Sequence, residues 1–181
     1  MTWANDITSP RPRRVHRPMA WYYDIRKRAE GDSNYNYSRI NNFLNNQMVK
    51  DALRVSDRPF SLSSSIVYEA MKGDIMRNYD VKISALLDDG IKVLIYVGDY
   101  YLLCNHLENS EWVLNMKWYA KEEFGKAPSL PYFVDNEEVG LLRSYGPLSF
   151  LRVYNAGHMV SMDQQKVALH MIRNWMQGEL N

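Results

Sequence analysis

Side chains capable of catalysis follow two apolar runs in this sequence. Asp99 and the chain's single cysteine, Cys104, come after the run Val93–Val97 and the glycine that ends it. His158 comes after a second β-rich run, in the order Asn-Ala-Gly-His. In open α/β sheets, catalytic and binding groups gather beyond the carboxyl ends of the strands. The two stretches are therefore candidate walls of one site.

An aspartate after one strand and a histidine after the last strand follow the chain order of the catalytic triad in α/β-hydrolases, in which the nucleophile comes earlier. In that triad the carboxylate fixes the tautomer of the imidazole, and the imidazole takes the proton of the nucleophile. A loop histidine can equally have only a structural role, so the order alone is a weak signal. A cysteine hydrolase built on Cys104 and His158 is an alternative that rests on that pair alone.

The elements expected around these residues alternate helices with strands, which indicates an α/β fold. The run Val93–Val97 is rich in β-branched residues and too short for a buried helix, so it is predicted to be a central strand buried on both faces. The runs Val139–Tyr145 and Leu148–Tyr154 flank a Gly-Pro turn and are predicted to form a hairpin. Apolar spacing predicts helices from the N-cap Ser38 to Leu53, over Val67–Met76, over Ile83–Asp89 with Gly90 after it, over Leu107–Met116, and from the N-cap Asp163 to Trp175. Residues 117–137 are predicted to be mixed, with loops at the prolines.

Composition excludes several classes of function. The 181 residues, 46% of them hydrophobic, favour one folded domain, and the net charge of +1 gives no reason to expect nucleic acid or an anionic membrane as partner. A single cysteine excludes an intramolecular disulfide. No apolar run approaches the ~20 residues needed to cross a bilayer, and the first 25 residues lack the apolar core of a signal peptide. Residues 1–18 hold three prolines among four arginines and are predicted to be a mobile tail.

From about Met19 to its end, the chain resembles the C-terminal part of the serine carboxypeptidases, in particular the carboxypeptidase Y-like vacuolar type of plants and yeast. The resemblance is carried by WYYDIRKRAEGD, NNFLNNQMVKDALRV, VYEAMKGDIMRN, ALLDDGIKVLIYVGDYYLLCN, LRVYNAGHMVSMDQ and MIRNWMQGEL. It implies a partial α/β-hydrolase fold, with residues 19–80 related to the helical cap and 81–181 forming the sheet and the histidine region. It also implies release of C-terminal residues from peptides at acid pH in a vacuole or lysosome-like compartment, with no cofactor and no metal.

Carried over residue by residue, the resemblance assigns the family's catalytic histidine to His158. The family's catalytic aspartate lies three positions after the glycine that ends the strand, and Tyr101 stands there in this chain. Asp99 matches the first acidic position of that pattern, which is not a triad member. Cys104, Asn105 and Met159 match positions in or beside the family's substrate pocket.

The substitution at position 101 has a direct chemical consequence. A phenol with a pKa of ~10 is uncharged at neutral or acid pH and does not stabilise an imidazolium as a carboxylate does. Loss of the charged carboxylate from a serine-protease triad lowers turnover ~10⁴-fold. Asp99 is a weak substitute, because it lies about 6–7 Å away along the strand direction.

The nucleophile of the family is also missing from the printed residues. No Gly-x-Ser-x-Gly elbow occurs among them, and the serines from Ser61 to Ser65 lack flanking glycines and a preceding buried strand. The sequence therefore predicts a truncated and inactive homologue. Two alternatives stay open: an active carboxypeptidase whose N-terminal half is missing from this sequence, and a non-enzymatic protein that pairs with another chain through an exposed sheet edge. Peptide C-termini are the expected partners only if the protein is active.

Overall fold

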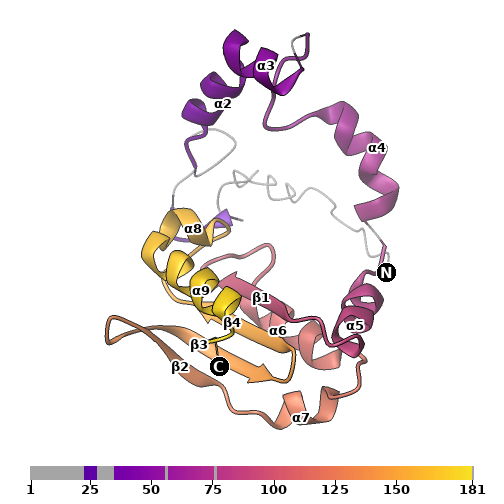
Figure 1. Ribbon diagram of the computed structural model, residues 1–181, viewed down its shortest axis with the longest axis vertical. Helices are drawn as coiled ribbons and strands as arrows, with labels where there is room; N and C mark the ends of the chain where they lie inside the picture. Colours follow the sequence, from indigo (N-terminus) through magenta and orange to yellow (C-terminus); the bar gives the residue numbers. More distant parts are fainter. Residues whose placement is uncertain (1–22, 28–34, 56, 76, 181) are drawn as a thin grey trace, which may run out of the picture.

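A four-stranded mixed sheet organises the C-terminal half of the chain in the computed structural model, which describes residues 23–27, 35–55, 57–75 and 77–180 (Figure 1). Its strand order is β1-β4-β3-β2, where β1 is Val93–Gly98, β2 is Leu130–Val134, β3 is Glu137–Tyr145 and β4 is Leu148–Val153. β1 runs parallel to β4, whereas β3 is antiparallel to both β4 and β2. The predicted α/β class is confirmed, and the tail predicted at residues 1–18 lies outside the described residues.

β1 occupies a different place in the sheet from the one that its residues alone predicted, whereas the exposed sheet edge expected from the family resemblance is found in the described part of the chain. The sequence indicated a central strand buried on both faces, but β1 is an edge strand in the described part of the chain, and the side chain of Tyr96 is 45% exposed. The central strand is β4, in which Leu148, Leu151 and Val153 have no exposed surface. A short apolar run does not reveal how many strands flank it, so the position of β1 could not be read from its residues.

The predicted hairpin is confirmed and is extended by a strand that the sequence did not indicate. β3 and β4 pair from Tyr145↔Leu148 to Gly140↔Val153 around a turn in which Gly146 has a φ of +55°. The region predicted as mixed contains the helix α7 (Lys121–Lys126) and the strand β2. Pro131 lies within β2, which tolerates a proline because it is an edge strand.

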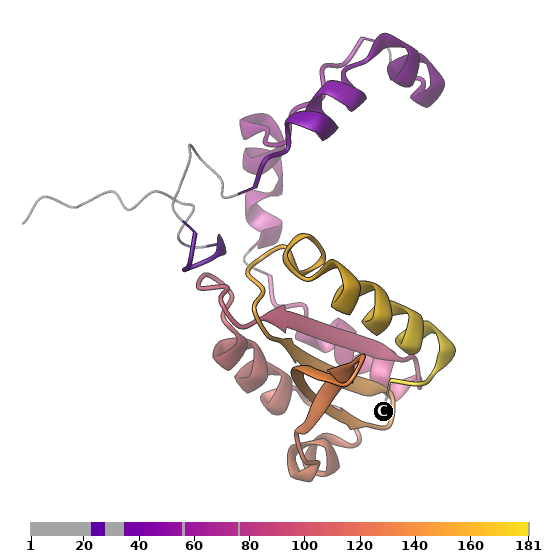
Figure 2. The same ribbon diagram turned by 90° about the vertical axis from the view of Figure 1, so that its left-hand side faces the viewer.

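Helices cover both faces of the sheet and form two hydrophobic cores (Figure 2). On one face, α8 (Val160–Asp163) and α9 (Gln165–Gln177) bring Val160, Val167 and Met171 against Leu142, Leu151 and Val153. On the other face, α5 (Asp80–Asp88), α6 (His106–Asn115) and α7 bring Leu87, Val113 and Phe124 against Leu148 and Phe150. This three-layer packing holds the carboxyl ends of β1 and β4 side by side.

Two predicted helix caps are wrong. α2 (Ser38–Leu44) begins after Tyr37, so Ser38 is its first residue, and no side chain caps it. The last helix begins at Gln165 after an uncapped Gln164, while Asp163 ends α8 and bonds elsewhere. Gly90 follows α5 with a φ of +75°, as predicted for a residue after a helix C-terminus.

A helical arm stands apart from the sheet in both views (Figures 1 and 2). It consists of α2, α3 (Gln47–Leu53) and α4 (Ser65–Ile75), and none of these helices contains a buried residue. Phe43, Met48 and Ile66 are 62%, 81% and 83% exposed. None of the helices in the described part of the chain is long and apolar enough to cross a bilayer.

Candidate functional site

The loops that follow β1 and β4 meet at one edge of the sheet and bring His158 against Tyr101. Gly98 pairs with Val153 at the last position of the parallel ladder, so both chains leave the sheet at the same level. The rings of Tyr101 and His158 have centroids 4.7 Å apart, and the ring of Tyr23 lies 5.0 Å from His158. The predicted meeting of the two stretches at a common edge is thus seen in the structure.

Close approach of the two loops depends on glycine. A Cβ atom at Gly98 would lie 2.3 Å from the carbonyl oxygen of Ala156, and a Cβ atom at Gly157 would lie 2.5 Å from the carbonyl oxygen of Tyr23. Both distances are below any contact that a Cβ atom makes in a folded protein. These two glycines therefore set the distance between the strand ends and the segment that carries Tyr23.

An open pocket of about 240 Å³ lies at this edge of the sheet. Burial raises the pKa of the Tyr101 hydroxyl, and a hydrogen bond with Cys104 raises it further, so the phenol remains protonated. Cys104 itself is exposed and forms no disulfide. The pocket is lined by Tyr96, Val97, Gly98, Tyr101, Cys104, Asn109, His158 and Val160.

The imidazole of His158 has aromatic neighbours where a triad would provide a carboxylate. Burial against these neighbours lowers its pKa, which favours the neutral ring. Among the described residues, no hydrogen bond joins this imidazole to an aspartate or glutamate. The imidazole can therefore lie at the rim of the pocket in its neutral form. Among the described residues, no carboxylate is placed to stabilise the protonated imidazole.

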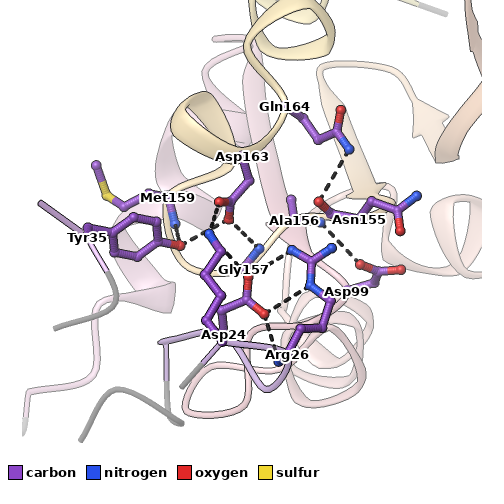
Figure 3. A network of polar contacts seen from close by, with 11 residues as sticks. Asp24, Arg26, Tyr35, Asp99, Asn155, Ala156, Gly157, Met159, Asp163 and Gln164 are labelled. Atoms are coloured by element: carbon purple, nitrogen blue, oxygen red, sulfur yellow. Dashed lines mark hydrogen bonds and ion pairs between the residues drawn. The ribbon is translucent and has the colours of Figure 1, made fainter. Parts of the chain in front are cut away.

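Asp99 lies away from the pocket. Its carboxylate accepts a hydrogen bond of 3.4 Å from the backbone N–H of Ala156 (Figure 3). It also lies 3.9 Å from the guanidinium of Arg152. These contacts fasten the loop after β1 to β4 and to the loop that follows β4. The arrangement gives Asp99 a structural role and does not bring it to His158.

Of the three residues expected in or beside the family's substrate pocket, Cys104 lines the open pocket described above, and Asn105 and Met159 do not. The side chain of Asn105 caps α6, where its oxygen accepts hydrogen bonds from the backbone N–H groups of Leu107 and Glu108 at 3.0 Å. The backbone N–H of Met159 donates to the hydroxyl of Tyr35. No group of three His, Cys, Asp or Glu side chains in the described ranges is placed to hold a metal ion.

Sequence analysis missed a buried ionic cluster beneath the loop of His158 (Figure 3). Asp24 has no exposed surface, and its carboxylate accepts hydrogen bonds from Nη2 and Nε of Arg26 at 2.7 and 3.0 Å. Burial by itself raises the pKa of Asp24, but the hydrogen bonds from Arg26 and the charges of Arg26 and Lys27 outweigh it, and the net pKa is lowered. Lys27 also pairs with Asp163, which links the cluster to the end of α8. The available signal was the run Asp-Ile-Arg-Lys, an acid followed closely by two bases.

This cluster reaches the backbone on both sides of His158. The N–H of Gly157 donates to Oδ2 of Asp163 at 2.8 Å, the N–H of His158 donates to the carbonyl of Tyr23 at 2.7 Å, and the N–H of Met159 donates to the hydroxyl of Tyr35 at 3.1 Å. Three consecutive backbone donors therefore have partners: those of His158 and Met159 lie far from them along the chain, and that of Gly157 lies six residues ahead. Such pairing fixes the loop much as a strand ladder would.

Comparisons with known proteins agree on one family. The family model described as serine carboxypeptidase matches residues 7–178. Over 160 residues the chain is 54% identical to serine carboxypeptidase-like 48 of Arabidopsis thaliana, and over 159 residues it is 50% identical to serine carboxypeptidase 3 of Oryza sativa. A serine carboxypeptidase-like protein of Pisum sativum is 51% identical over 159 residues. Each match covers 88% of this chain.

A solved structure shares the fold. The crystal structure of Kex1Δp, a prohormone-processing carboxypeptidase from Saccharomyces cerevisiae, is similar over 88% of this chain with a TM-score of 0.71 and 22% sequence identity. The chain covers 36% of that structure, and it covers 31% of the Arabidopsis relative, 32% of the rice relative and 56% of the pea relative. It therefore has a partial α/β-hydrolase fold, and it belongs to the serine carboxypeptidase family.

Proposed function

We propose that these 181 residues are the histidine-bearing C-terminal part of a serine carboxypeptidase-type hydrolase and that they do not hydrolyse peptides when assayed by themselves. The observation that carries the proposal is the contact between Tyr101 and His158, with ring centroids 4.7 Å apart. By the family resemblance, the phenol stands in place of the carboxylate that would orient and stabilise the imidazole in a triad. Family membership supplies the reaction class, namely release of residues from peptide C-termini.

The chemical environment of His158 supports this proposal. A triad needs a histidine that accepts a proton from a nucleophile and holds it as an imidazolium beside a carboxylate. Burial here lowers the pKa of His158, and Tyr101 stays protonated, so the charged form gains no anionic partner from it. The printed residues also contain no Gly-x-Ser-x-Gly elbow to supply the nucleophile and its backbone donors.

A second candidate is that the same residues act within a longer polypeptide. The chain covers only 31% of the length of serine carboxypeptidase-like 48, so two thirds of such a protein would add strands, nucleophile and oxyanion donors. In that setting the exposed edge of β1 would pair with a preceding part of the polypeptide, and a vacuolar or secretory location would follow from the family. Tyr101 would still lower turnover.

A third candidate is a non-enzymatic protein that binds another chain. The observation in its favour is that β1 is an edge strand and that α2, α3 and α4 have no buried residue. Unpaired strand edges and exposed apolar stripes are recognised surfaces for association.

Hydrolysis assays on the purified chain test the proposal. We expect no release of the C-terminal residue from a blocked dipeptide near pH 5, either with the unaltered chain or with a His158→Ala variant. A rate in the unaltered chain that disappears in the His158→Ala variant would contradict the proposal. Reading the coding frame upstream of Met1 tests the second candidate. A continuous frame that encodes Gly-x-Ser-x-Gly would show that these residues belong to a longer enzyme.

A further inference from the structure

His158 lies in a loop whose backbone is held from both sides by one pair of side chains. The carboxylate of Asp163 accepts the N–H of Gly157 at 2.8 Å, and the hydroxyl of Tyr35 accepts the N–H of Met159 at 3.1 Å. The two groups also bond to each other, because the Tyr35 hydroxyl donates to Oδ2 of Asp163 at 3.0 Å. The geometry points to Tyr35 and Asp163 as a positioning pair that fixes the orientation of the His158 imidazole.

The two peptide groups that flank His158 carry its own N–H and the N–H of Met159; Tyr35 holds the second of them, and Asp163 holds the peptide group one residue earlier through the N–H of Gly157. When the peptide groups on both sides of a residue are fixed, its φ and ψ angles have little freedom, and the direction of its Cα–Cβ bond follows. The N–H of His158 itself is fixed to the carbonyl of Tyr23 at 2.7 Å. The ring of Tyr23 in turn contacts the imidazole at a centroid distance of 5.0 Å. Backbone and ring are thus oriented by the same segment.

Burial makes the pair stiff. Tyr35 is 8% exposed and the side chain of Asp163 is 6% exposed, so water competes poorly for their hydrogen bonds. Burial raises the pKa of Tyr35, which keeps its hydroxyl available as a donor. The charge of Asp163 is balanced by Lys27, which also pairs with the fully buried Asp24. A buried carboxylate with a cation and two hydrogen-bond donors is stable in this position.

Helix capping does not account for Asp163. Its position just before α9 is typical of an N-cap, yet α9 begins after Gln164 without a side-chain cap. The carboxylate is instead directed to the loop of His158 and to residues from the N-terminal segment (Figure 3). This inference concerns the position of the imidazole and does not depend on whether the chain hydrolyses peptides.

The experiment compares Tyr35→Phe with Tyr37→Phe in the full chain. Tyr37 packs against Tyr35 at a centroid distance of 6.2 Å and so provides a matched control. Histidine ring signals are followed by NMR from pH 4 to 8, with His158→Gln used to assign the signal, and amide exchange is measured at Gly157 and Met159. In Tyr35→Phe we expect exchange at Met159 to rise about tenfold, because a hydrogen bond of ordinary net strength is lost. We also expect the pKa of His158 to rise toward its ordinary value as water reaches the ring.

The inference is overturned if Tyr35→Phe leaves the His158 titration and the Met159 exchange as they are in Tyr37→Phe, even where global stability falls. Asp163→Asn provides a second variant should Tyr35→Phe not fold, since the amide keeps the shape and an acceptor oxygen but loses the charge. It should broaden or shift the His158 ring signal relative to the unaltered chain. An unchanged His158 signal in a folded Asp163→Asn variant overturns the inference as well.

Discussion

The imidazole of His158 contacts two phenol rings, those of Tyr23 and Tyr101, at the rim of an open pocket. These rings remove water from one side of the imidazole without offering it a charge. The result is a histidine whose pKa is lowered by burial, whereas a triad histidine is kept basic by its carboxylate. A single substitution at position 101 therefore allows the electrostatics of the site to be tested directly.

We predict that Tyr101→Asp raises the pKa of His158. A carboxylate within about 4–6 Å favours the charged imidazolium and typically shifts the pKa of its partner by about one unit or more. The shift is read from the ring signals of His158 in an NMR titration between pH 4 and 9. Asp99→Asn is the control and should leave the titration unaltered, because Asp99 bonds to Ala156 and Arg152. A large shift in Asp99→Asn would show that Asp99 acts on the imidazole after all.

A second residue-scale prediction concerns the glycine before the histidine. In Gly157→Ala the new Cβ atom would lie 2.5 Å from the carbonyl oxygen of Tyr23 and 2.8 Å from Cβ of Asp24, so the backbone must shift. We expect the free energy of unfolding in urea to fall by about 1–3 kcal/mol, the usual cost of overpacking. Gly125→Ala is the matched control in α7: nothing lies within 4 Å of its Cβ position, and the change should be neutral or stabilising by up to about 1 kcal/mol. Equal effects at the two positions would argue against close packing at Gly157.

At the scale of elements, α6 illustrates how a residue near a site can have a structural task. The side-chain oxygen of Asn105 accepts two backbone N–H groups of the first turn. We expect Asn105→Ala to lower the free energy of unfolding by about 1 kcal/mol, the usual cost of losing an N-cap. Ser38→Ala should change it little, because Ser38 is the first residue of α2 and does not cap it. Urea unfolding of both variants provides the measurement, and a larger loss at Ser38 would contradict the assignment of the caps.

Elements with local signals could be predicted from the sequence, whereas those that depend on distant residues could not. The glycine turn between β3 and β4 and the apolar spacing of α6 were sufficient to place those elements. The edge position of β1 depends on which strands flank it, and its own residues do not give that information. β2 is short and contains Pro131, so its sequence is typical of a loop. The contact of His158 with Tyr101 followed from chain order and family resemblance. The cluster around Asp163 could not be predicted in this way, because its members come from both ends of the chain.

At the scale of the whole molecule, stability is distributed unevenly. β4 contributes fully buried residues to both cores, whereas the helices of the arm contribute none. Short helices without a buried face have little to hold them together in water. We predict that amides in α2, α3 and α4 exchange with solvent within seconds to minutes, while those of β4 exchange only on global unfolding. Hydrogen exchange followed by mass spectrometry tests this, and slow exchange in α4 would indicate a partner surface on the arm.

The register of β4 also fixes the order in which the sheet can form. β3 and β4 are joined by a tight turn, so they can pair within microseconds, as isolated hairpins do. β1 must instead close a long loop that contains α6, α7, β2 and β3 before Val93 meets Leu148. We therefore expect the hairpin to form first and to serve as the template for β1. In that order of events, Tyr101 and His158 meet only when β1 has docked, so that their contact would mark a late step in the assembly of the site.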